Sequence, residues 1–234
     1  MDLFFDSLLS FDLSVFEWIQ GIQNGFLDAV MVGITTTGNA GAIFIVLGFV
    51  LLFTKKYRKA GLAILVALIV MLLCNDLFLK EFFARVRPFN LFESNPEKYA
   101  EWGTKYVFPE LVYKPSGYSF PSGHTASAFA AATALLWHSR KWGVPTMIFA
   151  AFMGFSRIYV QVHYCTDVFG GIVAGAICGL IAVLIVKFIF PVVDKGLDKL
   201  SAKLKKTKAT LTLVGDETKI KDKIQELYPK NAQE

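Results

Sequence analysis

Two of the chain's three histidines lie beside residues that suit phosphoryl transfer. His163 is four residues before Asp167, so one helical turn, or a short loop, would let the carboxylate hold one ring nitrogen and make the other more nucleophilic. His124 follows Ser122 and Gly123 at the beginning of an apolar segment. Serine is a favoured helix N-cap, and the free N–H groups of a helix start form an anion site.

Positive side chains flank the same segments. Lys80 and Arg87 are seven residues apart, which is two helical turns, so they would face the same way on a continuous helix. Arg157 lies near the end of an apolar segment, where an arginine is costly unless it is paired or functional. Phosphoryl transfer requires positive charge around the equatorial oxygens, a nucleophile and an acid for the leaving group. We therefore expect one phosphate site where these side chains converge.

Long apolar segments must position these residues. Hydrophobic residues make up 54% of the 234-residue chain, and several runs approach the roughly 20 residues that span a bilayer. So many long runs with few internal charges exclude a soluble helical protein of this size. We predict an all-α polytopic membrane protein with six transmembrane helices and a polar loop, 84–120, on the catalytic side. The expected helices cover 15–36, 42–53, 61–83, 122–137, 144–160 and 167–190.

Helix packing and domain organisation also follow from composition. Gly171, Gly175 and Gly179 repeat every four residues, which predicts close approach of another helix. We expect a membrane domain over 1–193 and a lysine-rich cytoplasmic tail over 194–234.

The distribution of basic residues predicts the topology. They gather after the second, fourth and sixth expected helices, at Lys55, Lys56, Arg58 and Lys59, at Arg140 and Lys141, and at ten lysines in the tail. The positive-inside rule makes these places cytoplasmic. Both termini would then be cytoplasmic, and His124 and His163 would face the extracytoplasmic side. His138, beside Arg140 on the cytoplasmic side, is interpreted as structural. The placement of the net charge of +5 also argues against nucleic acid as a partner.

The candidate residues match three motifs in order and spacing. They are K-x6-R-P from Lys80 to Arg87 and Pro88, P-S-G-H ending at His124, and S-R-x5-H-x3-D ending at Asp167. Over about residues 15–190 the chain resembles the type 2 phosphatidic acid phosphatase superfamily. The resemblance implies that His163 attacks phosphorus and forms a phosphohistidine, that Asp167 orients it, and that His124 protonates the leaving oxygen. It assigns the phosphate oxygens to Lys80, Arg87, Ser122, Gly123 and Arg157.

The resemblance further implies a phosphatase of the cell membrane that acts on a lipid phosphate. Neither a metal nor another cofactor is expected, and the sequence offers no carboxylate cluster for a metal. Undecaprenyl diphosphate is the favoured substrate, with phosphatidylglycerol phosphate and phosphatidic acid as alternatives. The membrane helices argue against a vanadium-dependent haloperoxidase. A non-enzymatic lipid-binding or transport protein would need charges along a path through the helices, whereas here they gather at one face.

Overall fold

The computed structural model describes residues 2–94, 96–97, 99, 106, 108–214, 221–222 and 226. All regular elements within these residues are helices, as predicted for an all-α protein. The chain divides into two units, Met1–Phe188 and Ile189–Glu234. All of the candidate site residues lie in the first unit.

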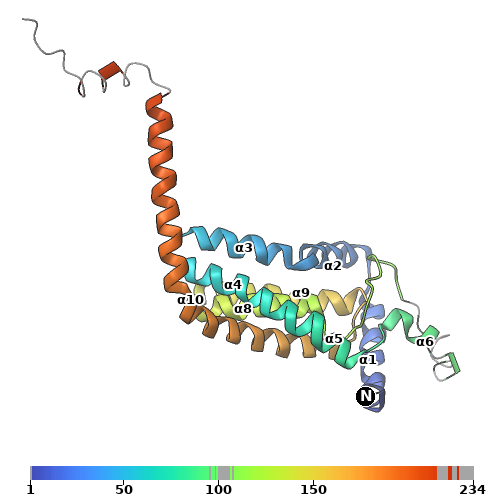
Figure 1. Cartoon of the computed structure of the whole chain (residues 1–234). Helices are drawn as coiled ribbons and strands as arrows, with labels where there is room; N and C mark the ends of the chain where they lie inside the picture. The colour runs from blue at the N-terminus through green and yellow to red at the C-terminus, as the bar shows by residue number, and fades with distance from the viewer. Residues whose placement is uncertain are drawn as a thin grey trace, which may run out of the picture. The chain divides into compact units, whose positions relative to one another are not determined.

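Five apolar helices run lengthwise through the first unit (Figure 1). They are α3 (Ala42–Phe53), α4 (Arg58–Met71), α8 (Gly123–His138), α9 (Arg140–Tyr159) and the first part of α10 (Cys165–Val214). A π-helical segment, Leu72–Leu79, and the short helix α5 (Lys80–Phe83) follow α4. Many outward side chains are large and apolar, among them Val46, Phe152 and Val173. Such a surface fits the hydrocarbon of a bilayer better than water.

Two segments within the described residues are long and apolar enough to cross a membrane. They cover Arg58–Ser94 and Cys165–Thr207. A third would be α2 (Gly25–Thr37) with α3, which meet at 53°, if this bent pair is one span. The prediction of six spans therefore remains a prediction.

The first expected span, 15–36, is wrong because the chain breaks within it. Residues Asp2–Ile22 form α1, and α2 begins at Gly25. Asn24, between them, has an extended backbone, and its side-chain oxygen accepts a hydrogen bond from the Leu27 amide. This N-cap starts a new helix where the sequence analysis expected a continuous one.

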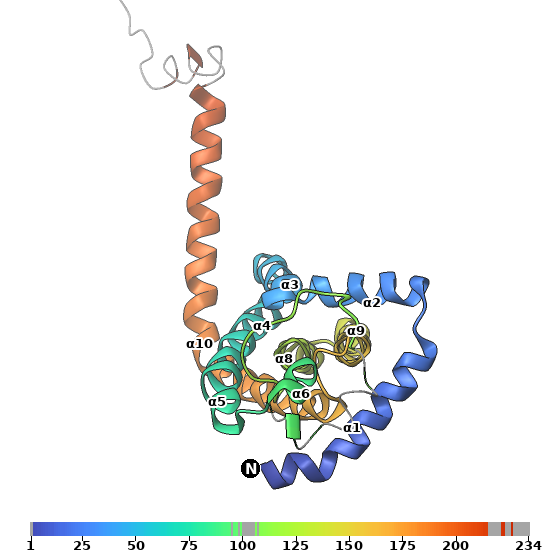
Figure 2. The ribbon, with the colours of Figure 1, turned by 90° about the vertical axis from the view of Figure 1, so that its right-hand side faces the viewer.

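Both ends of α2 contact the same end of α9. The Gln23 side chain donates to the Tyr159 carbonyl oxygen at 3.2 Å, and Arg157 donates to the Thr35 hydroxyl at 2.5 Å. Figure 2 looks toward that end of the unit and shows α1 and α2 lying across it, with α8 and α9 seen along their axes. We call it the catalytic end, because Arg157, His163 and His124 lie there.

The predicted close packing against α10 is confirmed. An added Cβ atom at Gly171, Gly175 or Gly179 would lie 2.4–2.8 Å from a carbonyl oxygen of Ser122 or of α8. Such distances are far too short for a side chain. The contact also joins the two motif-bearing helix starts, since the Ser122 amide donates to the Asp167 carbonyl oxygen at 3.0 Å.

The polar loop and the tail are described in part. The loop contains a 3₁₀ turn, Pro88–Asn90, and the helix α6 (Leu91–Ser94), while residues 95, 98, 100–105 and 107 lie outside the described residues. In the second unit α10 continues to Val214. Residues 215–220, 223–225 and 227–234 of the expected tail lie outside the described residues, and the expected domain boundary at 193 stays a prediction.

Candidate active site

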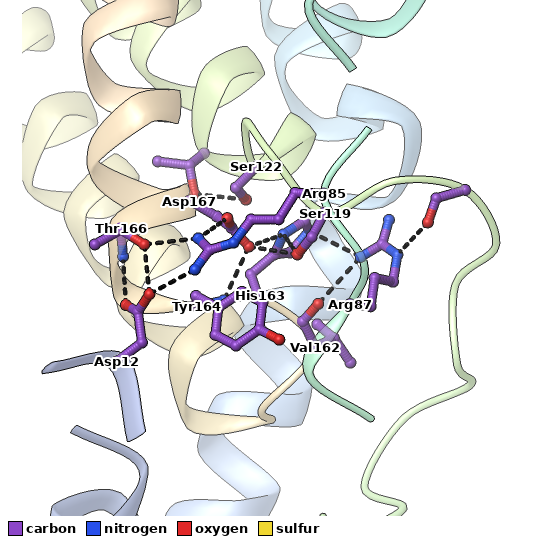
Figure 3. A network of polar contacts seen from close by, with 12 residues as sticks. Asp12, Arg85, Arg87, Ser119, Ser122, Val162, His163, Tyr164, Thr166 and Asp167 are labelled. Atoms are coloured by element: carbon purple, nitrogen blue, oxygen red, sulfur yellow. Dashed lines mark hydrogen bonds and ion pairs between the residues drawn. The ribbon is translucent and has the colours of Figure 1, made fainter. Parts of the chain in front are cut away.

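His163 lies in the short connection between α9 and α10, and Asp167 lies in the first turn of α10. The His163 Nδ1 atom is 3.3 Å from the Asp167 Oδ2 atom, and both side chains are buried. The same carboxylate accepts hydrogen bonds from the Tyr164 amide at 2.9 Å and from the Ser119 hydroxyl (Figure 3). A carboxylate at Nδ1 favours the tautomer that carries a proton there, which leaves the lone pair on Nε2. The expected pairing of these two residues is therefore present.

Burial sets the charge of the candidate nucleophile. It lowers the pKa of His163 to about 3, and the hydrogen bond with Asp167 opposes this shift without overcoming it. The imidazole is therefore neutral at pH 7, with its lone pair on Nε2.

We expect the His163 ring to stay neutral down to about pH 5. Nitrogen-15 spectra of histidine-labelled protein can test this, with the signal assigned by its loss in His163→Asn. Because the folded-state pKa lies below the unfolded value of about 6.5, the unfolded chain binds the extra proton between the two values. This group should therefore destabilise the fold as pH falls below about 6.5. A His163 signal that titrates near pH 6.5 would contradict the expectation.

Arg87 is held beside the other ring nitrogen. Its Nε donates to the Gly117 carbonyl oxygen at 2.9 Å, its Nη2 to Ser116 at 3.3 Å and its Nη1 to Val162 at 3.1 Å. The Nη1 atom also lies 3.2 Å from His163 Nε2. A guanidinium fixed at this place can donate to an oxygen of a phosphate whose phosphorus faces Nε2.

Lys80 and Arg87 do not share a helix, so the continuous helix on which they would face the same way is not formed. The helix ends at Phe83, and Ala84 has a φ of 46°, in the left-handed region that ends helices. Arg87 follows in extended conformation. The two cations therefore reach the site from a helix and from a loop.

The beginning of α8 forms another side of the site. Ser122 occupies the N-cap position as predicted, yet its hydroxyl caps no helix N–H and accepts a hydrogen bond from Thr125 at 3.0 Å. A Cβ atom at Gly123 would lie 3.3 Å from the Lys80 Nζ atom, so glycine lets Lys80 lie close to the helix start. His124 Nε2 is 3.1 Å from the Asn39 side-chain oxygen. Burial and the nearby positive charges of Arg157, Lys80 and Arg87 disfavour a proton on the His124 ring when no anion is bound.

Arg157 is buried, and one of its hydrogen-bond donors has no partner within the described residues. Its Nη1 donates to Thr35, whereas its Nε has no hydrogen-bond partner within the described residues. Buried donors without partners are rare and ask for an explanation. A phosphate oxygen would satisfy this donor.

Lys80, the third expected phosphate-binding cation, forms an ion pair with Asp76 at 2.5 Å.

Four polar residues around the site were missed from the sequence. Arg85 donates to Asp167 at 2.6 Å, and Asp12, Ser119 and Thr166 complete the network around this pair. Arg85 occupies a variable position of the first motif, so the motif gave it no weight. Asp12 could have been found from the sequence, because it is an acidic residue on the face of α1 that carries Leu9, Leu13 and Phe16.

A cavity of about 700 Å³ borders this site at Lys80 and His124. Apolar side chains of α3 and α4, such as Phe49 and Leu65, line most of it. Lys80, Gly123 and His124 lie at its polar end. No group of three or more His, Cys, Asp or Glu side chains suited to a metal occurs in the described part of the chain.

Residues 56–191 match the model of the PAP2 superfamily. The chain belongs to this superfamily. Its three motifs all lie within the matched region, and together with the apolar helices they make it a membrane phosphatase of the PAP2 type.

Characterised proteins of the superfamily are similar to most of the chain. Identity is 32% over 182 residues with the undecaprenyl-diphosphatase BcrC of Bacillus subtilis, covering 77% of this chain and 86% of that protein. It is 30% over 178 residues with an undecaprenyl-diphosphatase of Sulfolobus acidocaldarius, covering 76% and 79%. A crystal structure of a transmembrane PAP2-type phosphatidylglycerolphosphate phosphatase from Bacillus subtilis aligns with a TM-score of 0.58 and 27% identity, covering 75% of this chain and 84% of that one.

Proposed function

We propose that this protein removes phosphate from a membrane lipid through a phosphohistidine intermediate. The observation that carries the proposal is the apolar cavity that ends at Lys80, Gly123 and His124. An acyl or prenyl chain fits its apolar walls, and a phosphate group at its polar end would reach the neutral His163. A binding or transport protein has no need for a buried histidine with an orienting carboxylate.

The reaction has two steps. The lone pair of His163 Nε2 forms a bond to phosphorus, and the bond from phosphorus to the leaving oxygen breaks. His124, which the negative charge of the bound phosphate allows to carry a proton, gives that proton to the leaving oxygen. Water then attacks the phosphohistidine, the bond to Nε2 breaks, and neutral His124 takes the proton of the water. Arg87, Arg157 and Lys80 stabilise the negative charge on the phosphoryl oxygens in both steps.

Undecaprenyl diphosphate is the substrate we favour. Two relatives named as undecaprenyl-diphosphatases, at 32% and 30% identity, support this choice. Phosphatidylglycerol phosphate remains the alternative, because a phosphatidylglycerophosphatase B of Bacillus subtilis is 29% identical over 170 residues. Phosphatidic acid is the third candidate.

The catalytic end faces the extracytoplasmic side in this proposal. Lys55 and Lys56 lie in the turn that joins α3 to α4, Arg58 and Lys59 begin α4, and Arg140 and Lys141 begin α9. All lie at the opposite end of the lengthwise helices. The positive-inside rule would place that end in the cytoplasm. Because α1 and α2 lie across the catalytic end, the N-terminus would then be extracytoplasmic. This proposal has five crossings, by α3, α4, α8, α9 and α10, whereas the sequence predicts six crossings with both termini cytoplasmic.

Phosphate release from a panel of lipid phosphates tests the proposal. The purified protein in detergent is given undecaprenyl diphosphate, phosphatidylglycerol phosphate and phosphatidic acid, each with and without a chelator. We expect the highest kcat/KM for undecaprenyl diphosphate and less than a twofold effect of the chelator. Tight lipid binding without turnover of any member would contradict the proposal, and loss of activity with chelator would contradict its metal independence.

A further inference from the structure

The Arg85 side chain is built into the centre of a buried polar network. Its Nη1 donates to Asp167 Oδ1 at 2.6 Å and to the Thr166 hydroxyl at 2.7 Å, and its Nη2 donates to Asp12 Oδ2 at 2.8 Å. Both carboxylates are fully buried. The guanidinium thus joins an acid of α1 to the acid that pairs with the candidate nucleophile.

The surroundings leave this guanidinium little freedom. Its central carbon lies 4.4 Å from the ring centre of Phe5 and 3.9 Å from that of Tyr164. A planar guanidinium can stack on aromatic faces while its edge donates hydrogen bonds. The plane is thereby fixed by the rings and the direction of its edge by the two carboxylates.

Asp12 also binds α10 directly. Its Oδ1 accepts a hydrogen bond from the Thr166 amide at 3.0 Å, and its Oδ2 accepts one from the Thr166 hydroxyl at 2.6 Å. Thr166 is the residue before Asp167. One carboxylate of α1 therefore holds both the first turn of α10 and the arginine that binds Asp167.

We propose that α1 is part of the catalytic apparatus, because Asp12 acts through Arg85 to position Asp167 and thereby the nucleophile His163. Figure 3 shows these contacts running from Asp12 through Arg85 and Asp167 to the imidazole. Asp12 and Arg85 are positioning residues, since the phosphate is assigned to Lys80, Arg87 and Arg157. The inference rests on the proposed phosphatase reaction.

The test compares Asp12→Asn, Arg85→Lys and the double variant, using phosphate release from the best lipid substrate of the panel. Hydrogen-bond partners that orient a metal ligand commonly contribute about 10–100-fold to activity, and we expect the same range for partners that orient a catalytic side chain. We expect Asp12→Asn to lower kcat about 10–100-fold, because the guanidinium loses one of its two anchors, with KM changed less than about threefold. Inhibition by inorganic vanadate, a phosphate analogue, should likewise stay within about threefold, because the phosphate-binding cations are untouched.

The double variant tests whether Asp12 acts through Arg85. Lysine keeps the charge but cannot reach both carboxylates at once. If Asp12 works through Arg85, kcat of the double variant stays close to that of Arg85→Lys. Two losses that multiply would contradict this, since independent sites contribute additively in free energy.

The matched control is Glu17→Gln on the same helix. The Tyr106 hydroxyl, which is not part of the network, donates a hydrogen bond to Glu17 at 2.9 Å. Its kcat and KM should stay within twofold of the wild type. Thermal unfolding of every variant is measured alongside.

Two further results would overturn the inference alone. One is an Asp12→Asn variant with kcat within twofold of the wild type. The other is a parallel change of kcat, KM and unfolding temperature, which would assign α1 a structural role only. Wild-type protein without turnover of any lipid phosphate would instead overturn the proposed function and this inference with it.

Discussion

Replacing His163 by alanine should lower kcat for phosphate release by at least about 10⁴-fold for every lipid phosphate. The loss is this large because no phosphohistidine can form without the Nε2 lone pair. The remaining cations can still bind phosphate, so the affinity for inorganic vanadate should change far less. Steady-state turnover gives kcat, and brief mixing with phosphorus-32-labelled substrate should leave acid-labile label on the wild type and none on the variant.

His138→Ala is the matched control for this loss. His138 ends α8 at the opposite end of the unit from the site and was interpreted as structural. Its replacement should leave kcat within about twofold, in the range of substitutions away from special sites. An active His163→Ala protein would exclude the phosphohistidine mechanism. An inactive His138→Ala protein that remains folded would show that the histidine roles are assigned wrongly.

Replacing His124 by alanine should have an effect that depends on the leaving group. General acid catalysis contributes about 10²–10⁴-fold, and its value rises as the leaving oxygen becomes more basic. For phosphatidic acid, which expels an alkoxide, we expect kcat to fall by about 10³-fold. For an aryl phosphate such as p-nitrophenyl phosphate, the leaving phenolate needs no proton, and the loss in this step should stay below about tenfold.

The ratio of these two losses is the decisive measurement. The second step uses His124 as a base for both substrates, so the losses are compared for the first step, as rates of enzyme phosphorylation in a single turnover. Equal losses there for the alkyl and the aryl substrate would contradict the acid role of His124. Asn39→Ala is the useful companion, because Asn39 lies 3.1 Å from His124 Nε2 and orients the ring. It should show the same dependence on the leaving group with a smaller amplitude.

Local spacing determined most of the candidate site. His163 and Asp167 lie four residues apart, so the chain can pair them within one turn at the beginning of α10. The start of α8 at Gly123 and the end of α9 at Tyr159 follow from where apolar segments begin and end. Such features depend on neighbours in the sequence, and a sequence shows neighbours directly.

The tertiary structure decided the role of the N-terminal region. The sequence predicts one span over 15–36, whereas the N-cap at Asn24 divides the segment into α1 and α2. Hydropathy alone could not distinguish one helix that crosses the bilayer from two helices that lie across the catalytic end of the helical unit. Contacts with Tyr159 and Arg157, more than a hundred residues away, distinguish them.

The sequence by itself therefore determined the helical class, the motif-bearing helix ends and the pairing of His163 with Asp167. Only the tertiary structure showed that Arg85 lies between Asp12 and Asp167. The physical reason is that this arrangement depends on the direction of one side chain and on a contact across 154 residues between Asp12 and Thr166. Neither periodicity nor motif spacing carries that information.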